Sequence, residues 1–374
     1  MNKENMTNEI VQEEIGATET AQVSLSDNAR IISPGQLVLR RFFRSKLSLI
    51  GLAMLVVMFV FCLIGPFFAT WGQAEIDESS VTEYGYAQVI VKDADGNEHV
   101  VYQMTSFTTS INKYAKPFTK SQHYTKEVVN ADGKIEKVDY PERMHILGTD
   151  ENGRDVFTRL MYGGQKSILL SLMTVTLYLT LGILLGALAG YVGGWVDQII
   201  MRIVDVINCI PSLPIMLILA AALELRVAPE ARIYYLLAIL TLLSWTGIAR
   251  LVRGQILFLR EQEYMVAADA LGLPATRKIF KHLIPNIVPQ LIVTATLGLG
   301  SMILYESTLS YLGLGFPLEI ASWGRMVNSA TTFEILKNYP HIWVPAGICI
   351  IITVLGFNFM GDGLRDALDP KMKR

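Results

Sequence analysis

The stretch EYMVAADALGLPATRKIFKHLIP, residues 263–285, lies between two long apolar segments and decides how the chain is interpreted. Each half repeats apolar side chains at helical spacing, and Gly272 and Pro274 favour a turn between the halves. Pro285 then closes the second helix. The pattern predicts a helix–turn–helix finger that binds in a groove of a cytosolic partner, with a partnerless interfacial hairpin as the alternative. The predicted apolar faces are Tyr264, Met265, Ala268 and Leu271, then Ile279, Phe280, Leu283 and Ile284.

This finger resembles the coupling segment, or EAA loop, of ABC importer permeases. The matching positions are Ala267, Ala268, Gly272 and Pro285, whereas Val266 stands where the family has Glu. The resemblance implies that residues 261–285 dock onto partner ATPases. The candidate coupling residues are Glu263, Ala267, Ala268, Asp269, Gly272 and Pro285.

The composition is that of a membrane protein. Of the 374 residues, 51% are hydrophobic and only 18% are charged, and the net charge of -2 suggests no nucleic-acid partner. Cys62, Cys209 and Cys349 lie in apolar runs and are interpreted as small core residues, not disulfides. The first 30 residues are polar and acidic, which predicts a disordered cytosolic tail and no cleavable signal peptide.

Six segments without Asp, Glu, Lys or Arg are long enough to cross a bilayer, which takes about 17–25 mostly apolar residues. Lys and Arg gather before the first segment, between the fourth and fifth, and after the sixth. Because positive residues favour the cytosolic side, both termini and the finger are predicted in the cytosol of a multi-pass cell-membrane protein. The segments are Leu47–Thr70, Ser167–Val196, Val206–Leu223, Ile233–Ala249, Asn286–Tyr305 and Ile342–Met360.

Residues 71–146 are predicted to form a small β-rich extracellular insertion. Asp95-Gly96 and Asp132-Gly133 each lie between two short strand-like segments, where hairpin turns need positive φ. The insertion is longer than the corresponding segment in many members of the resembled family. It either touches a substrate-binding lipoprotein or only covers the outer mouth.

Four further stretches resemble peptide-type ABC permeases. Residues 145–166, HILGTDENGRDVFTRLMYGGQK, match an LGTD-x-x-GRD-V motif of dipeptide, oligopeptide and nickel permeases. Residues 303–317 and 356–370 resemble the same permeases, and residues 33–55 resemble the N-terminal part of their C subunit. The resemblance implies an all-α integral membrane protein with six transmembrane helices of the type I ABC importer kind.

The predicted organisation follows these segments. After the tail (1–30) come an elbow and the first transmembrane helix (31–70), the insertion (71–146) and an outer-surface helix (147–165). The transmembrane permease domain (166–362) ends at Asp362 and Gly363, and a cytosolic tail (363–374) follows. Residues 31–46 either lie along the inner interface as an elbow helix or only fix the topology as a positive flank.

Glycines recur every four residues in the second predicted span, which allows another helix to approach closely. Either a second permease or the chain's own bundle could supply that helix. The glycines are Gly182, Gly186, Gly190 and Gly194.

Few ionisable residues lie near the predicted spans. Glu306 is expected near the outer end of the fifth, where it could line the path or contact a neighbouring subunit. Asp205 could pair with Arg202, three residues earlier. Pro211 in the third span favours a kink.

The sequence carries no recognisable catalytic, cofactor-binding or metal site. Gly164-Gln165-Lys166-Ser167 lacks the Gly-Lys junction of a P-loop, and the histidines lack metal-ligand spacing. We therefore expect no enzyme, and an intramembrane hydrolase has no support in the sequence. Any ATP and Mg²⁺ are expected in partner ATPases.

The sequence thus predicts a permease subunit of an ATP-driven ABC importer, most simply for oligopeptides, that forms half of the translocation path. The resemblance implies two P-loop ATPases, a B-type second permease and an extracellular substrate-binding protein as partners, and the lipid bilayer as the surroundings of the chain. Dipeptides, nickel chelates or glutathione are alternative substrates. An ATP-independent secondary transporter and an extracellular receptor or adhesin built on the insertion are alternative functions.

Overall fold

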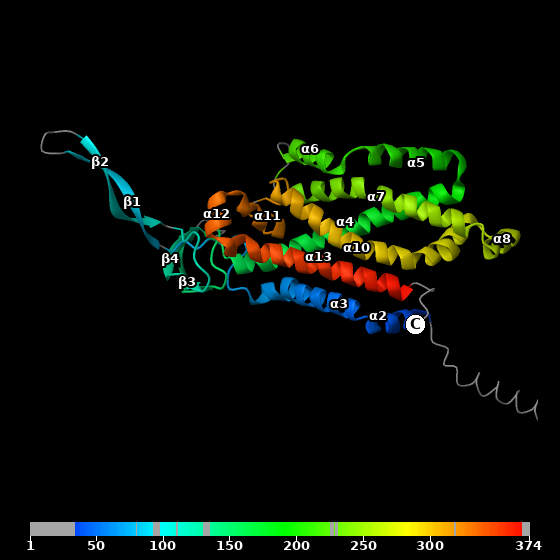
Figure 1. Cartoon of the computed structure of the whole chain (residues 1–374), viewed down its shortest axis with the longest axis horizontal. Coiled ribbons are helices and arrows are strands. Elements are labelled where there is room, and N and C mark those ends of the chain that lie inside the picture. Colours follow the sequence, from blue (N-terminus) through cyan, green and yellow to red (C-terminus); the bar gives the residue numbers. More distant parts are fainter. Residues whose placement is uncertain are drawn as a thin grey trace, which may run out of the picture.

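The computed structural model describes residues 34–79, 81–92, 98–109, 111–129, 135–224, 228, 231–317 and 319–368. Long helices lie side by side in an elongated bundle, and strands project from one end (Figure 1). The tail predicted for residues 1–30, the two predicted Asp-Gly turns and the last six residues lie outside the described residues.

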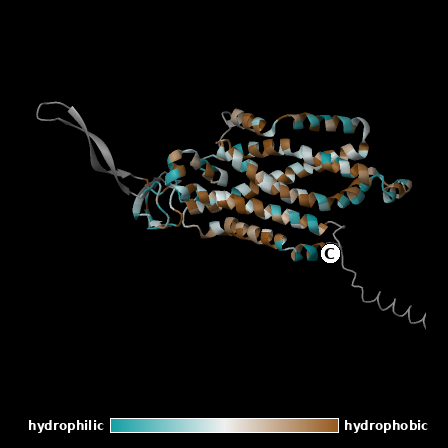
Figure 2. Ribbon diagram, in the orientation of Figure 1, coloured by the Kyte–Doolittle hydropathy of each residue, from teal (hydrophilic) through white to brown (hydrophobic). Residues whose placement is uncertain are grey.

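Five helices in the described part of the chain are long and apolar enough to cross a membrane. Figure 2 shows that hydrophobic residues predominate along these helices. The first span combines α3 (Lys46–Phe59), η1 (Val60–Ile64) and η2 (Gly65–Phe68). The second, third and fifth spans are α4 (Val156–Val192), α7 (Arg232–Leu259) and α13 (Pro340–Leu368). The fourth combines α9 (Ala275–Arg277), η4 (Lys278–Leu283) and α10 (Ile284–Tyr311).

The predicted third span at residues 206–223 is not one straight helix. The chain forms α5 (Gly194–Cys209) and α6 (Ser212–Glu224), which meet at an angle of 84°. Pro211 lies in the break, and Ile210 before it has an extended backbone, because a proline disfavours helical backbone in the preceding residue. Five straight spans and this bent pair give up to six crossings.

Close packing of helix pairs holds the bundle together. α4 packs against α7, α3 against α13, and α10 against α13. One apolar cluster at the strand-bearing end contains Ile303, Trp323 and Ile342, and another at the opposite end contains Val252 and Leu283. The short helix α2 (Pro34–Arg44), at the predicted elbow, packs against α3 and α13.

The predicted β-rich insertion is confirmed. β1 pairs with β2 and β4 with β5 in two antiparallel hairpins, and β3 pairs with β6. Three short helical segments lie at the same end of the bundle (Figure 1). The strands are β1 (Val81–Lys92), β2 (Glu98–Thr109), β3 (Thr119–Lys120), β4 (Tyr124–Val129), β5 (Ile135–Tyr140) and β6 (Met144–His145); the helical segments are α11 (Trp323–Asn328), η5 (Ser329–Thr331) and α12 (Phe333–Asn338).

Two predicted boundaries are wrong. Residues 147–155 form a folded loop instead of a surface helix, and α4 starts at Val156 because the Asp155 carboxylate accepts the Thr158 N–H at 2.7 Å. The last helix continues past Asp362 and Gly363 to Leu368. Gly363 is an interior helix residue that α3 approaches closely, since an added Cβ would lie 1.8 Å from the Ser48 Oγ.

Candidate functional site

The predicted finger protrudes from the end of the bundle opposite the strands (Figure 1). α8 (Glu263–Ala270) forms its first half. Gly272 has a φ of +68°, and the Gly272 and Leu273 N–H groups donate to the carbonyls of Asp269 and Ala268. This pair of bonds is the Schellman motif, which favours glycine at the left-handed position after a helix.

The second half of the finger is not a separate helix. α9, η4 and α10 follow one another without a break, so Pro285 lies in the first turn of α10 and does not close a helix. Inside this continuous run Pro285 has no N–H to donate, and the π-helical turn η4 lies directly before it. The second half of the finger is therefore continuous with a membrane-spanning helix.

Only part of each predicted apolar face packs against the bundle. Met265, Ala268 and Leu283 are buried. The exposed apolar side chains of the finger are Tyr264 (42% exposed), Val266 (61%), Leu271 (79%) and Phe280 (60%). Tyr264, Leu271 and Phe280 of the predicted apolar faces are exposed, because the finger extends beyond the bundle that could cover them. We call Val266, Leu271 and Phe280 the exposed tip.

Polar contacts brace the finger across its turn. The Lys278 ammonium forms an ion pair with Asp269 and lies 5.7 Å from the centre of the Tyr191 ring. The Asn286 amide donates to the Tyr264 hydroxyl across the turn at 3.4 Å. Glu263 in the first turn of α8 and Ala267 are exposed. The roles of the six candidate coupling residues stay predictions.

Three of the four recurring glycines lie against the chain's own α7. A Cβ added at Gly182, Gly186 or Gly190 would lie 2.5–2.9 Å from atoms of that helix. Gly194 differs, because it starts α5 with a φ of +56° and has no atom within 4 Å of an added Cβ. The first three therefore permit packing of α4 on α7, whereas Gly194 permits the turn into α5.

Glu306 is fully buried where α10 meets α4 and α11. Its Oε1 accepts the Ser310 hydroxyl at 2.7 Å, and Ser167, Ser307 and Ser322 also lie beside the carboxyl group. In this chain its partners are serines of the same bundle. A path or subunit contact of Glu306 stays a prediction.

Two ion pairs join α5 to α7. Asp205 pairs with Arg250 at 3.0 Å, not with Arg202 as predicted, and Asp197 pairs with Arg253. The sequence analysis ended the fourth span at Ala249 and placed both arginines in the following loop. α7 continues to Leu259, so both arginines lie on a membrane-spanning helix.

A buried cluster at the strand-bearing end was missed by the sequence analysis. The His145 imidazole lies between two carboxylates, with Nδ1 2.8 Å from Asp155 and Nε2 3.1 Å from Asp77. The Asn112 amide donates to Asp77 at 2.8 Å. Trp71 stacks on the His145 ring at 4.3 Å. We call these five residues the outer clamp. The LGTD-x-x-GRD-V motif, which contains Asp155, was the only sequence signal that pointed to this region.

Opposing effects set the ionisation of the outer clamp. Burial alone would lower the pKa of His145, but Asp155 and Asp77 outweigh it and raise the pKa above its ordinary value. Burial would raise the pKa of Asp77, but hydrogen bonds from His145, Asn112 and Ser79 lower it. The two carboxylates therefore favour the protonated form of the imidazole.

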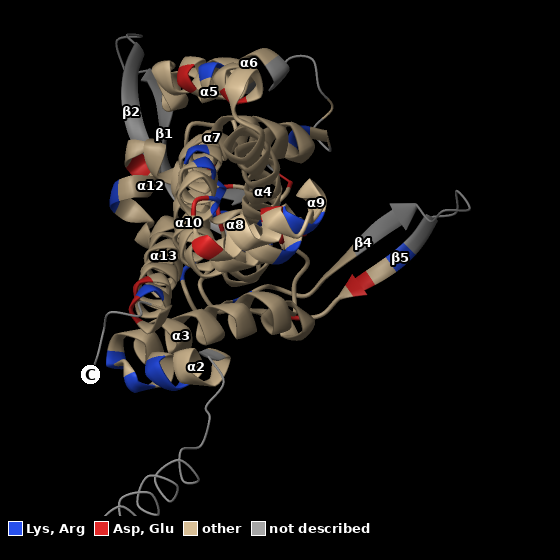
Figure 3. Ribbon diagram, turned by 90° about the vertical axis from the view of Figure 1, so that its right-hand side faces the viewer, with Lys and Arg blue, Asp and Glu red and all other residues tan. Residues whose placement is uncertain are grey.

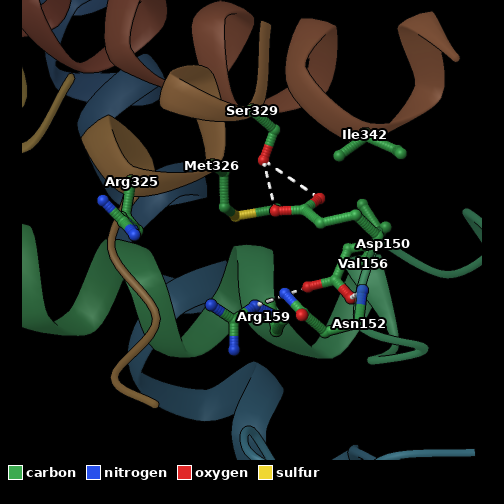
Figure 4. A pocket seen from close by; sticks show the side chains of 9 residues that line it. Asp150, Asn152, Val156, Arg159, Arg325, Met326, Ser329 and Ile342 are labelled. Carbon is green, nitrogen blue, oxygen red and sulfur yellow. Dashed lines mark hydrogen bonds and ion pairs between the residues drawn. The ribbon is translucent and has the colours of Figure 1, made fainter. Parts of the chain in front are cut away.

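A cavity of about 20 Å³ separates the start of α4 from α11 and η5 (Figure 4). The Glu151 carboxylate accepts the Ser329 hydroxyl at 3.1 Å, and Arg159 pairs with Asp150 at 3.5 Å. Burial raises the pKa of Asp150, although Arg159 opposes that effect. The volume suits about one water molecule, so this cavity is too small for a transported solute. No group of three or more His, Cys, Asp or Glu among the described residues could hold a metal ion.

Comparison with known families identifies the bundle. Residues 182–374 match the model of the binding-protein-dependent transport system inner membrane component, and residues 33–84 match the N-terminal TM domain of oligopeptide transport permease C. The first match covers just over half of the 374 residues. The chain belongs to this family of transport permeases.

Curated members of this permease family are similar over most of their length. The oligopeptide transport system permease protein OppC of Bacillus subtilis is 39% identical over 70% of this chain and 81% of its own. The dipeptide transport system permease protein DppC of Alkalihalophilus pseudofirmus is 40% identical over 62% and 74%, respectively. A probable D,D-dipeptide permease, DdpC of Escherichia coli, is 41% identical over 62% and 75%.

Among solved structures, inward-facing conformations of the MetNI methionine ABC transporter match with a TM-score of 0.43 and 19% identity. The match covers 56% of this permease and 96% of the other chain.

Proposed function

We propose that this permease is a subunit of an ATP-driven peptide importer, that it forms half of the translocation path, and that its finger couples it to partner ATPases. The exposed tip carries this proposal. Val266, Leu271 and Phe280 project beyond the bundle on a braced turn, while Met265 and Leu283 anchor the same segment in the core. An apolar tip on a rigid support suits a hydrophobic groove on a cytosolic protein.

ATP hydrolysis in this proposal takes place in two partner P-loop ATPases, which bind ATP and Mg²⁺. Closure of the ATPases moves the finger, and the continuous α9–α10 helix carries that movement into the bundle. The bundle then alternates between inward-open and outward-open states. The finger can shift this equilibrium only through contacts that differ between the two states. The proposed orientation has both chain termini in the cytosol, in keeping with the distribution of Lys and Arg.

Peptides are the proposed substrate class because similar permeases are named for oligopeptides, dipeptides and D,D-dipeptides. The family description also implies a substrate-binding protein, since its members belong to binding-protein-dependent systems. A second, B-type permease would supply the other half of the path.

The test compares two exposed apolar residues at opposite ends of the bundle. Leu271→Asp places a charge on the exposed tip, and Phe333→Asp, on α12, is the matched control, because Leu271 and Phe333 are 79% and 74% exposed. The complex is purified in mild detergent, its subunits are identified by mass, and peptide uptake is measured in vesicles.

We expect two ATPases and a second permease to co-purify with the unmodified chain and with Phe333→Asp. Leu271→Asp should lose the ATPases and ATP-dependent uptake while remaining in the membrane. If no ATPase accompanies the unmodified chain even after crosslinking, or if Leu271→Asp retains its ATPases, the coupling proposal is wrong.

A further inference from the structure

A cavity at the strand-bearing end lies outside the membrane-spanning helices. It has a volume of about 240 Å³ and lies at the base of the β4–β5 hairpin, which projects to one side in Figure 3. A cavity for one water molecule needs only about 10–15 Å³, so this one admits a whole side chain of another molecule. The lining residues, all from the insertion, are Ala74, Glu75, Ile76, Glu78, Tyr124 and Tyr140.

Two aromatic rings form part of the cavity wall. Tyr124 begins β4 and Tyr140 ends β5, and the two residues pair across the hairpin. Their rings stack with centres 4.9 Å apart and an angle of 5° between the planes, and both residues are partly exposed. The face of an aromatic ring carries partial negative charge and attracts a cation within about 6 Å of its centre. This part of the wall therefore favours a cationic group over an anionic one.

Two glutamates supply the charge of the lining. The Glu75 carboxylate accepts the Gly72 N–H at 2.8 Å and two N–H groups of Arg143 at 2.5 and 3.2 Å. Because a carboxylate has about four acceptor positions, one position on Glu75 remains for a further donor. Glu78 is the second acidic residue, and no lysine, arginine or histidine is among the described residues that line the cavity.

Arg143 does not cancel the negative charge of the cavity. Its guanidinium carbon lies 3.6 Å from the centre of the Trp71 ring, and only 17% of the side chain is exposed. Burial raises the pKa of Tyr124, and the Asp77 and Glu75 carboxylates each raise it by more than Arg143 lowers it. The electrostatic potential at the Tyr124 hydroxyl is therefore negative, which favours a cation beside it.

The cavity is fixed by contacts within the chain itself. The main chain of Glu78 forms a hydrogen bond with the Tyr124 hydroxyl. Asp77, the residue before Glu78, belongs to the outer clamp and contacts the His145 imidazole at 3.1 Å. Groups that are already held in place lose little conformational freedom when a partner binds. The lining is therefore preorganised for an occupant.

The size and place of the cavity indicate which occupant it suits. Lys and Arg side chains carry a cation on a methylene stem that covers apolar surface. The volume is smaller than the about 300–1,000 Å³ of pockets that enclose a whole small ligand. A transported peptide has to enter the bundle, whereas the cavity lies on the insertion, where a protein that delivers the peptide would touch the permease.

From these observations we infer that the cavity binds a Lys or Arg side chain of the extracellular substrate-binding protein. The cationic group lies beside the carboxylates of Glu75 and Glu78, and the stem lies against the rings of Tyr124 and Tyr140. The inference rests on the proposed importer function and gives its binding protein a specific contact. Complementary charge of this kind steers a partner into one orientation.

The test reverses the charge at Glu78, because Glu75 also fixes Arg143. Glu142→Lys is the matched control, since Glu142 is exposed two residues after β5 and does not line the cavity. The binding protein that co-purifies with the complex is titrated, without ATP and at two ionic strengths, against membrane vesicles that contain each assembled variant. Hydrogen exchange of residues 148–156 reports whether the outer clamp stays folded.

We expect Glu78→Lys to raise the Kd of docking at least about tenfold, because it brings like charges together. Glu142→Lys should dock like the unmodified chain. Glu78→Gln, which keeps the shape of the side chain, should weaken docking less and reduce its dependence on ionic strength. Among variants of the binding protein in which single Lys or Arg residues are changed to Glu, one should restore docking to Glu78→Lys.

Equal docking by folded Glu78→Lys and Glu142→Lys variants would overturn the inference, and so would the failure of every charge reversal in the binding protein to restore docking. Where Glu78→Lys disturbs the clamp, unchanged docking by Glu78→Gln overturns it instead. If docking is unchanged but the KM for a transported peptide rises, the cavity serves the peptide and the inference is wrong. Because docking needs no ATP, docking that depends on Glu78 without ATP-driven peptide uptake would refute the importer function and leave the docking contact standing.

Discussion

At the scale of single residues, His145 is a fully buried titratable group held between two carboxylates outside the membrane-spanning helices. It joins Asp77, which follows the first span, to Asp155, which caps α4. All three side chains are at most 3% exposed. Removing one partner from such a buried charge cluster costs about 3–5 kcal/mol, because the remaining charges stay buried without compensation. His145→Ala should therefore destabilise the strand-bearing end by that amount.

The stability of the outer clamp should depend on pH in a predictable direction. The pKa of His145 is raised in the folded state, so its contribution is complete below the unfolded value of about 6.5 and is lost as the pH rises through the folded pKa. The pKa of Asp77 is lowered, so its contribution is present above about pH 3.9 and is lost at lower pH. The clamp should be strongest between these limits.

Hydrogen exchange of peptides covering residues 111–118 and 148–156 checks this prediction in the purified protein. After correction for intrinsic rates, protection should fall above neutral pH in the unmodified chain, and His145→Ala should abolish that part of the pH dependence. His123→Ala is the control, because His123 pairs with Asp139 at the surface. An identical alkaline profile in the unmodified chain and His145→Ala would refute a charged clamp.

At the scale of elements, the turn of the finger depends on backbone conformation, not on space. Gly272 has a φ of +68°, and nothing lies within 4 Å of an added Cβ. Gly272→Val should strain the turn by about 1–2 kcal/mol and uncouple ATP hydrolysis from uptake, whereas Gly272→Asn should retain coupling because asparagine tolerates this region. Uptake per ATP hydrolysed is the measurement, and equal coupling in both variants would argue against a rigid turn.

The contact between α4 and α7 gives a second prediction. A Cβ at Gly186 would lie 2.5 Å from the Ala249 carbonyl, so Gly186→Leu must separate the helices and cost several kcal/mol. Gly247→Ala, on the open side of α7, should instead stabilise the helix by about 0.5–1 kcal/mol. Thermal unfolding in detergent compares the two; a Gly186→Leu variant as stable as the unmodified chain would contradict the packing of α4 on α7.

Local patterns predicted which elements exist better than where they end. The apolar runs located the helices, and the two Asp-Gly pairs located both hairpins. Charge in residues 150–155 was mistaken for a surface helix, although Asp155 ends that loop as a cap. Pro285 and Gly363 were taken as helix ends, yet the helix runs on through Pro285 after the π-helical turn η4, and Gly363 is required by packing on α3. Whether a helix ends at such a residue depends on which other elements pack against it, and a single sequence does not reveal that packing.

At the scale of the whole molecule, the membrane bundle and its finger were predictable because periodicity and spacing define them. The outer clamp was not, because its members come from residues 71, 77, 112, 145 and 155 and no local pattern links them. The open side of α7 also needed the fold, since only packing shows which side of a helix remains uncovered. Long-range polar contacts and uncovered surfaces are therefore what the structure adds.

The strand-bearing end suggests how to test the proposed contact with a substrate-binding protein. Removing residues 75–140 would also delete Asp77 and Asn112 and so break the outer clamp. The chain returns to itself after β2, because the Asn112 N–H donates to the Asp77 carbonyl at 2.9 Å. A deletion of residues 81–109, replaced by a short glycine linker, should therefore leave the clamp and the bundle folded.

We expect this variant to dock the binding protein more weakly. Uptake should fall when the binding protein is limiting but not when it is in excess. Titration of the binding protein against membrane vesicles measures docking and uptake, and hydrogen exchange at residues 148–156 is the control for folding. If a folded deletion variant docks the binding protein unchanged, the β1–β2 hairpin only covers the outer mouth.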